Sequence, residues 1–213
     1  YALDDYQTFE LTIPEQIACK VIANSQDDLF ILRTILKSIS GKDRFLNIEL
    51  KTMSRIDQVY LEETDVLILQ DPKYLSASAI ESMKRFLGEG GSILWFAGKN
   101  SENIDSITSS NLKLPEFIGR VQLEDQSYFS VEVQDRENPI LQELNLRDIN
   151  SALPQVYIYN SVEKQSYHKR ILSLNNDDPF FIEIPHSGSQ IYNNIGVTGT
   201  NAVYRFLEQF RIA

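Results

Sequence analysis

The chain has 213 residues, of which 42% are hydrophobic and 23% charged, so it can bury a core without disulfides or metals. Its net charge of −10 repels nucleic-acid phosphates, and we expect no nucleic-acid partner. The single cysteine, Cys19, excludes an internal disulfide and any multi-cysteine metal site. No apolar run reaches the length of about 18 residues that predicts a transmembrane helix.

Residues 1–17 are predicted to form an N-terminal arm or edge strand. The alternating run Thr8–Ile13 meets Pro14, and proline in sheets is confined to edges. Residues 18–213 contain no linker, repeat or low-complexity segment, which predicts a single α/β domain. Because the sequence begins at Tyr1, we expect it to be a segment of a longer protein.

The first hundred residues alternate between apolar runs and helical stripes. The apolar runs predict strands over Ala18–Asn24, Phe45–Thr52, Asp65–Gln70 and Ser92–Ala97. Asp27 or Asp28 is expected to cap the first helix, and Ser78-x-x-Glu81 to form a capping box at a later one. Since a helical segment joins each strand to the next, we expect one parallel, flavodoxin-like sheet.

The second half predicts mainly antiparallel strands. A β-ribbon is predicted from "EFIGRVQLE" and "SYFSVEVQ", and a short helix from "NPILQELNL". Further strands are predicted in "QVYIYNSVE", "KRILSLN", "PFFIEIP" and "SQIYNNIGV", with turns at Asn-Asp-Asp-Pro and at His186-Ser187-Gly188. A last helix is expected over Asn201–Phe210. The expected architecture is a mainly parallel sheet flanked by helices, with added antiparallel strands.

The order of these segments resembles a class I glutamine amidotransferase-like domain. The resemblance rests on "KVIANSQDDLFILRTILKSI", "ETDVLILQDPKYLSASAIESMKRFLGEGGSILWFAG", "ENPILQEL" and "DDPFFIEIPHSGSQIYNNIGV". The non-catalytic version in Bat-type, aerotolerance-related bacterial membrane proteins is closer, and "LDDYQTFEL" is similar to its lead-in. The resemblance implies a soluble domain of a membrane protein, with the extracytoplasmic side slightly favoured. Its implied partners are proteins or neighbouring domains, and its implied membrane contact lies outside this chain.

The turn after the fourth predicted strand is where catalytic relatives carry a Gly-x-Cys-x-Gly nucleophile elbow. The matching stretch here is Phe96-Ala97-Gly98-Lys99-Asn100, which has no cysteine, serine or threonine at its apex. The histidine and glutamate partners of the family would lie where this chain has Asn193-Asn194-Ile195-Gly196. We therefore expect neither amidotransferase activity nor a cofactor.

Other residues that could support chemistry have simpler structural interpretations. Cys19 is expected to be a buried, unreactive hydrophobe, since no basic environment surrounds it. Ser101 is either a displaced nucleophile or, more simply, the N-cap of the next helix. Gly90-Gly91 predicts a turn, because a phosphate loop needs Gly-x-x-x-x-Gly-Lys-Ser/Thr before a helix.

The remaining candidates are metal ligands. His168 and His186 have no second ligand at metal-binding spacing and are expected to be surface histidines. The pairs Asp27-Asp28 and Asp177-Asp178 predict caps and turns, because no calcium-loop pattern surrounds them. We therefore expect no metal site.

Two functions follow from these observations. The first is a non-catalytic interaction or sensing module of a larger membrane-associated bacterial protein. The second is a hydrolase or small-molecule-binding domain that uses the crevice at the C-terminal strand ends, where open α/β sheets bind ligands. The residues expected to line this crevice are Asn24, Ser25, Gln70, Asp71, Gly98, Lys99 and Asn100. These side chains can form hydrogen bonds but include no evident proton-transfer pair.

Overall fold

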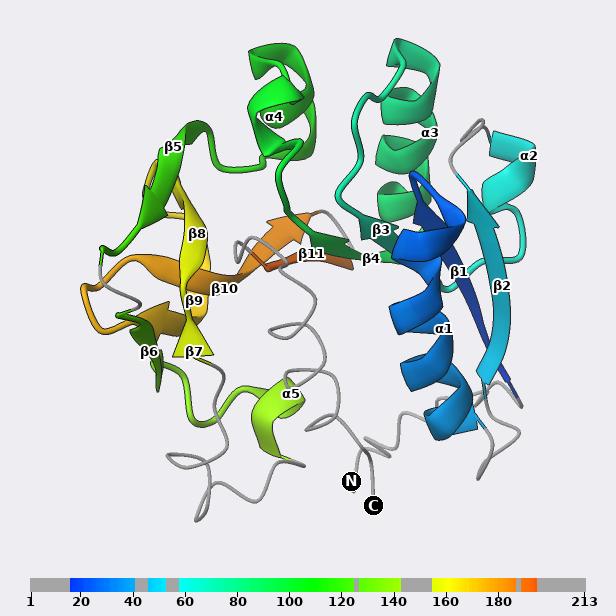
Figure 1. The fold of residues 1–213 in the computed structure, drawn as a ribbon. Helices are drawn as coiled ribbons and strands as arrows, with labels where there is room; N and C mark the ends of the chain where they lie inside the picture. The colour runs from blue at the N-terminus through cyan, green and yellow to red at the C-terminus, as the bar shows by residue number, and fades with distance from the viewer. Residues whose placement is uncertain are drawn as a thin grey trace, which may run out of the picture.

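The computed structural model shows a large mixed sheet flanked by helices, with a small separate ribbon (Figure 1). It describes residues 16–40, 46–52, 58–124, 127–142, 155–186 and 189–194. The large sheet has nine strands in the order β2-β1-β3-β4-β11-β10-β9-β6-β7, and β5 and β8 form the ribbon. The α/β, flavodoxin-like architecture expected from the sequence is thereby confirmed.

One half of the sheet is parallel, as predicted. Its strands are β2 (Leu46–Thr52), β1 (Ile17–Ala23), β3 (Val66–Gln70) and β4 (Ser92–Phe96). The register places Val21 opposite both Leu50 and Ile68, and Ile68 opposite Leu94. The connecting helices are α1 (Gln26–Ser40), α2 (Gln58–Leu61) and α3 (Ala77–Gly88). The C-terminal ends of these strands therefore meet at one edge of the sheet.

The start of α1 differs from the prediction, because Ser25 and not Asp27 or Asp28 is the capping residue. The backbone N–H of Asp28 donates to Ser25 Oγ at 3.3 Å, and Ser25 Oγ donates to the Asp28 carboxylate at 2.7 Å. Asp27 and Asp28 instead lie in the first turn, where negative charge complements the helix dipole.

The predicted capping box at α3 is also wrong. The side chain of Ser76 accepts the hydrogen bond of Ala79 N–H at 3.2 Å, so Ser76 is the N-cap and Ser78 lies inside the helix. Three serines stand close together here, at positions 76, 78 and 82. Local pattern alone does not distinguish them, because each is a favoured capping residue type.

The other half of the sheet is antiparallel, as predicted, apart from its junction with the first half. Its strands are β11 (Ser189–Asn194), β10 (Pro179–His186), β9 (Lys169–Leu174), β6 (Phe129–Val133) and β7 (Gln155–Val156). β11 pairs with β4 in parallel, and the remaining pairs are antiparallel. The short helix α5 (Pro139–Gln142) confirms the one predicted in that stretch.

The predicted β-ribbon between neighbouring segments is wrong. β5 (Phe117–Gln122) pairs with β8 (Ile158–Val162), while β6 pairs with β9 and β7. Figure 1 shows β5 and β8 side by side, set apart from the parallel strands. Alternating apolar residues predict that a segment is a strand, but they do not select its partner.

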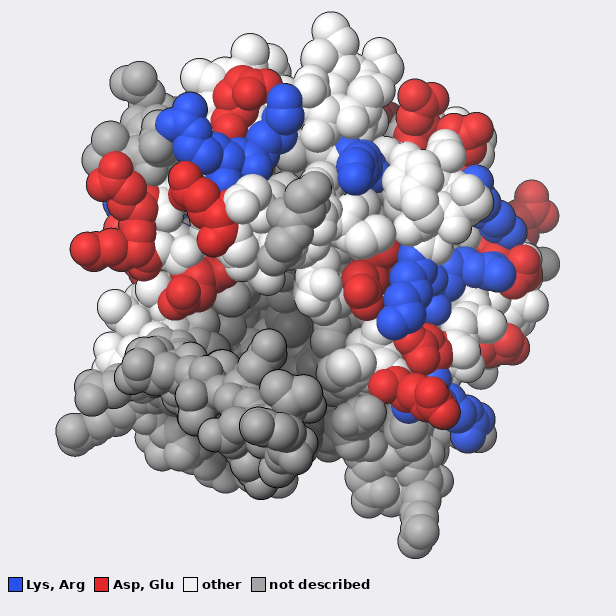
Figure 2. All heavy atoms as spheres, turned by 180° about the vertical axis from the view of Figure 1, so that it is seen from behind, with Lys and Arg blue, Asp and Glu red and all other residues white. Residues whose placement is uncertain are grey.

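Two apolar cores lie on opposite faces of the sheet. Neighbouring residues of β4 divide between them: Phe96 belongs to the core that α1 covers, and Trp95 to the core that α3 covers. This division follows from the alternation of side chains along a strand. On the face seen in Figure 2, basic and acidic side chains lie next to one another among the described residues.

Some of the expected features fall outside the described residues, namely the strand at Thr8–Ile13, the helix at Asn201–Phe210, the turn residues Ser187 and Gly188, and Ile195-Gly196. Within the part of the chain that the structure describes, no helix is both long enough and apolar enough to cross a membrane. β1 begins at Ile17, one residue before the predicted domain boundary.

Candidate functional site

The predicted crevice residues do come together at the C-terminal edge of the parallel strands. Asn24 and Ser25 follow β1, Gln70 and Asp71 lie at the end of β3, and the segment 98–100 follows β4. Asp71 is central to this edge. Its backbone N–H donates to Phe96 O at 2.8 Å, and its φ of 44° places it in the left-handed region.

The polar groups of this edge bond to one another. Asn100 donates to Asp71 three times: its backbone N–H to Oδ1 at 3.0 Å, and its Nδ2 to Oδ2 at 2.8 Å and to the carbonyl oxygen at 3.2 Å. From the other side, Asn24 Nδ2 donates to Asp71 O at 2.5 Å, and Asn24 Oδ1 accepts from Lys73 N–H at 3.2 Å. The hydrogen-bonding capacity that the sequence offers to a ligand is therefore largely used within the protein.

Gly98 makes the approach of Asp71 to this turn feasible. A Cβ at position 98 would lie 2.4 Å from Asp71 Cγ, closer than any real contact. Burial raises the pKa of Asp71 above its usual range, although the hydrogen bonds from Asn100 and the charge of Lys99 oppose the shift. The structure therefore requires a glycine at this position for close packing against a carboxylate.

The turn after β4 has the position of a nucleophile elbow but not its free donors. Gly98 N–H donates to Ser101 Oγ at 3.2 Å, and Asn100 N–H is bound to Asp71. An oxyanion hole requires such N–H groups to be available to the substrate. Lys99 at the apex is exposed.

Ser101 is not the N-cap that the sequence indicated. It begins a short 3-10 helix, η1 (Ser101–Asn103), and its hydroxyl oxygen accepts the hydrogen bond of Gly98 N–H from inside the elbow. The following helix α4 (Ser106–Leu112) is capped by Asp105, whose Oδ1 accepts from Thr108 N–H at 2.6 Å. The serine therefore braces the turn and does not cap the helix.

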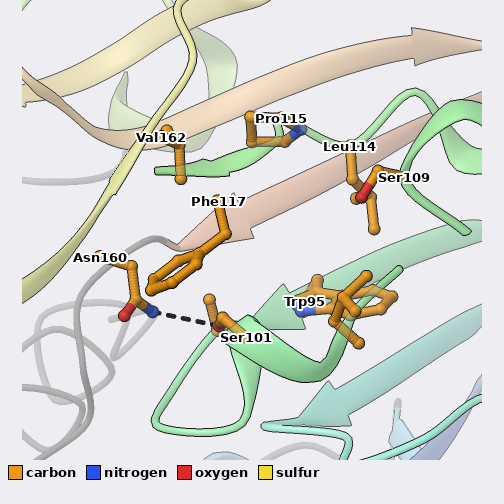
Figure 3. A pocket seen from close by; sticks show the side chains of 10 residues that line it. Trp95, Ser101, Ser109, Leu114, Pro115, Phe117, Asn160 and Val162 are labelled. Atoms are coloured by element: carbon orange, nitrogen blue, oxygen red, sulfur yellow. Dashed lines mark hydrogen bonds between the residues drawn. The ribbon is translucent and has the colours of Figure 1, made fainter. Parts of the chain in front are cut away.

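The β5–β8 ribbon fixes the elbow from outside. Asn160 Nδ2 donates to Gly98 O at 3.0 Å and to Ser101 Oγ at 3.1 Å, the second of which Figure 3 shows. Arg120, paired with Asn160 across the ribbon, donates to Lys99 O at 2.9 Å. Sequence reasoning missed Arg120 and Asn160, because only the long-range pairing of β5 with β8 brings them here. Two adjacent polar residues, Asn160 and Ser161, among the apolar residues of β8 were the available signal.

Behind the elbow lies a small cavity of about 30 Å³. Most of its lining is apolar, including Trp95, Leu114 and Phe117 (Figure 3). This volume has room for one or two water molecules and for no substrate. The cavity therefore does not turn the elbow into an active site.

The other candidate residues are either buried in the core or lie in turns. Cys19 is buried, as predicted, and burial raises its pKa to about 11, which disfavours the thiolate. Gly90 has φ 98° and a Cβ at Gly91 would overlap the ring of Phe86, so the pair forms the predicted turn. Asp177, with φ 65°, lies in the turn between β9 and β10.

The histidines are not the free surface residues that we expected. His168 Nε2 lies 2.8 Å from Lys113 O, and His186 Nε2 lies 3.0 Å from Leu112 O, so both contact carbonyls at the end of α4. Both are half-buried, and burial lowers the pKa of each. Among the described residues, no group of three potential ligands is placed to hold a metal ion.

No protein-family model matches the chain, and no curated protein matches its sequence. Solved structures do share its fold. A cytoplasmic protein from Salmonella typhimurium superposes with a TM-score of 0.66 at 11% identity, over 92% of this chain and 95% of that one. A ThuA-like protein from Bacteroides uniformis does so with a TM-score of 0.59 at 15% identity, over 97% and 94%.

A part of a larger enzyme is similar as well. A β-galactosidase from Rahnella matches with a TM-score of 0.62 at 9% identity, over 91% of this chain but only 30% of that chain. At these identities the likeness concerns the fold alone. The chain has the class I glutamine amidotransferase-like fold of the ThuA-like proteins.

Proposed function

We propose that this chain is a non-catalytic interaction or sensing module of a larger membrane-associated bacterial protein. The observation that carries the proposal is the internal bonding of the elbow. Its Gly98 and Asn100 amides are bound to Ser101 and Asp71, and its apex residue is an exposed lysine. Nucleophilic catalysis needs a hydroxyl or thiol beside a base, together with free oxyanion donors.

The second candidate function, a hydrolase, needs an activated nucleophile and a general base at this edge. The hydroxyl oxygen of Ser101 accepts from Gly98 N–H and Asn160 Nδ2, and no described histidine contacts it. Asp71 is the one carboxylate here with a raised pKa, but two hydrogen bonds from Asn100 hold its oxygens. A general base must reach the proton that it abstracts, which this arrangement does not favour.

The membrane context rests on the resemblance to Bat-type proteins, in which such a domain is attached to transmembrane helices. On this basis the domain is a soluble part of a membrane protein, with the extracytoplasmic side favoured and with proteins or neighbouring domains as partners. The likeness to 30% of the β-galactosidase supports the modular part of the proposal, since the fold there occurs within a longer chain.

The proposed absence of catalysis is tested by assaying the hydrolysis of glutamine and of activated esters. Wild type, Ser101→Ala and Asp71→Asn are each expected to show no turnover above buffer. Turnover by the wild type that Ser101→Ala abolishes, while circular dichroism shows the variant folded, would overturn the proposal in favour of the hydrolase.

The membrane part needs a separate experiment on the full-length protein. After cell fractionation, the protein is expected in the membrane pellet and is released by detergent but not by high salt. Recovery in the soluble fraction without detergent would contradict membrane association and leave the result of the hydrolysis assay unaffected.

A further inference from the structure

A second recess lies in the antiparallel half of the molecule. It opens between the loop that follows β8 and the turn between β9 and β10, and its volume is about 410 Å³. Small-ligand sites typically measure roughly 300–1,000 Å³. The recess shares no lining residue with the elbow, so a ligand bound in it would add to the proposed function and would not depend on it.

The recess has an apolar base and a charged rim. Val162, Pro179 and Ile182 lie at its base, where Val162 is half-buried and Pro179 and Ile182 are buried, while Glu163, Lys164, Arg170 and Asp177 supply charges of both signs. Since His168 is the other ionisable group in the lining and burial lowers its pKa, it is neutral near pH 7. Two positive and two negative side chains therefore face the recess, and their charges cancel.

The basic side chains keep hydrogen-bonding capacity. Arg170 uses Nη1 to contact Asp177, at 2.8 Å to Oδ1 and 3.4 Å to the carbonyl oxygen. No hydrogen bond within the described part of the chain engages its Nη2 or Nε. Lys164 Nζ lies 3.5 Å from Asp177 Oδ2 and 3.3 Å from Asp178 Oδ1, longer than the usual ~2.7–2.9 Å of charge-assisted bonds.

The acidic side of the rim is also available. Glu163 is exposed, and its Oε2 accepts a hydrogen bond from Gln165 Nε2 at 2.7 Å. Among the ion pairs of the described residues, none involves Glu163. A carboxylate with several acceptor positions can therefore still bind a cation.

We propose that this recess binds a small zwitterion, of the class of free α-amino acids with an apolar side chain. The ligand carboxylate pairs with the Arg170 guanidinium, and its ammonium pairs with the Glu163 carboxylate. Its side chain lies over Val162, the half-buried apolar residue of the base. A simple anion would face Glu163 and Asp177, and a simple cation would face Lys164 and Arg170, whereas separated opposite charges satisfy both.

Calorimetric titration with leucine, N-acetyl-leucine and leucinamide tests this assignment. Leucine is expected to bind saturably at millimolar concentration, and each blocked analogue about tenfold more weakly, because it has lost one charge. Arg170→Gln should remove the discrimination against leucinamide, and Glu163→Gln the discrimination against N-acetyl-leucine. Arg170→Lys keeps the positive charge but loses the planar guanidinium, so it should retain part of the discrimination against leucinamide.

The matched control is Glu81→Gln, which breaks the exposed pair with Lys84 on α3 and should leave leucine binding unchanged. Circular dichroism confirms that each variant is folded before it is titrated. The proposal is overturned if leucine gives no saturable binding, if both blocked analogues bind the wild type as well as leucine does, or if Glu81→Gln has the same effect as the two recess variants.

Discussion

Gly98 has no side chain, and the Asp71 carboxylate lies where the Cβ of any other residue at position 98 would be. The Asp71 carboxylate reaches the elbow, and Asn100 then binds both of its oxygens. The sequence placed Asn24, Asp71 and Asn100 at one edge, because parallel strands end together. It did not indicate that these residues bond to one another, since hydrogen-bond partners depend on packing and not on spacing.

Gly98→Ala is expected to destabilise the protein by about 1–3 kcal/mol, because the added Cβ overlaps Asp71 and forces a local shift. Gly88→Ala is the matched control. A Cβ there meets nothing within 4 Å, and the new residue should stabilise α3 by about 0.5–1 kcal/mol. Urea unfolding measures both changes, and equal effects at the two positions would refute the packing role of Gly98.

Cys19 should resist thiol reagents in the native state. It is 4% exposed, and burial raises its pKa to about 11, so both access and thiolate formation are disfavoured. Labelling by a chromogenic disulfide reagent is expected to be complete in concentrated urea and negligible in buffer. Rapid labelling in buffer would show that β1 is less well packed than the structure indicates.

Among the elements, the β5–β8 ribbon holds the elbow in place, a role that its sequence does not predict. Arg120 and Asn160 are paired across its two strands. Arg120 donates to the carbonyl oxygen of Lys99, and Asn160 donates to that of Gly98. The sequence did indicate the four parallel strands, because each is linked to the next by a helix that limits the topology. The pairing of β5 with β8 joins distant segments, and no local signal specifies such a pairing.

Asn160→Ala should cost about 1–3 kcal/mol, because it removes two hydrogen bonds to the elbow from a side chain that is 1% exposed. Gln122→Ala on the exposed side of the same ribbon is the control and should change stability by less than about 0.5 kcal/mol. Chemical denaturation of both variants gives the comparison. A loss at Gln122 equal to that at Asn160 would mean that the ribbon contributes through its strand pairing alone.

The end of α4 should make the fold sensitive to mild acid. Burial lowers the pKa of His168 and His186, and the charge of Lys113 further lowers that of His186. The unfolded chain therefore binds more protons than the folded one as pH falls below the ordinary histidine value of about 6.5. Stability should decline from there towards the lower folded-state values.

Urea unfolding across this pH range measures the decline. The double variant His168→Gln, His186→Gln should flatten it, since glutamine can still donate to the carbonyls of Leu112 and Lys113 without titrating. An unchanged slope in that variant would assign the acid sensitivity to other groups.

At the scale of the whole molecule, a shared fold does not imply a shared chemistry. The superposition with a ThuA-like protein extends over 97% of this chain at 15% identity, so the fold is shared although most of the sequence differs. The sequence indicated the absence of a nucleophile, because that is a matter of which residue occupies the apex. It did not reveal the bracing by Ser101 and Asn160 or the charged recess, because both arise where distant segments meet.

The Gly98 and Asn100 donors of the elbow are bound inside the protein and are not held ready for a substrate. Native-state hydrogen exchange of these two amides, followed by NMR, measures whether they are bound or free. These amides bind Ser101 Oγ and Asp71 Oδ1, so we predict protection comparable to that of the β4 core. Exchange at the rate of an unstructured peptide would show the donors to be free, and would contradict the non-catalytic account.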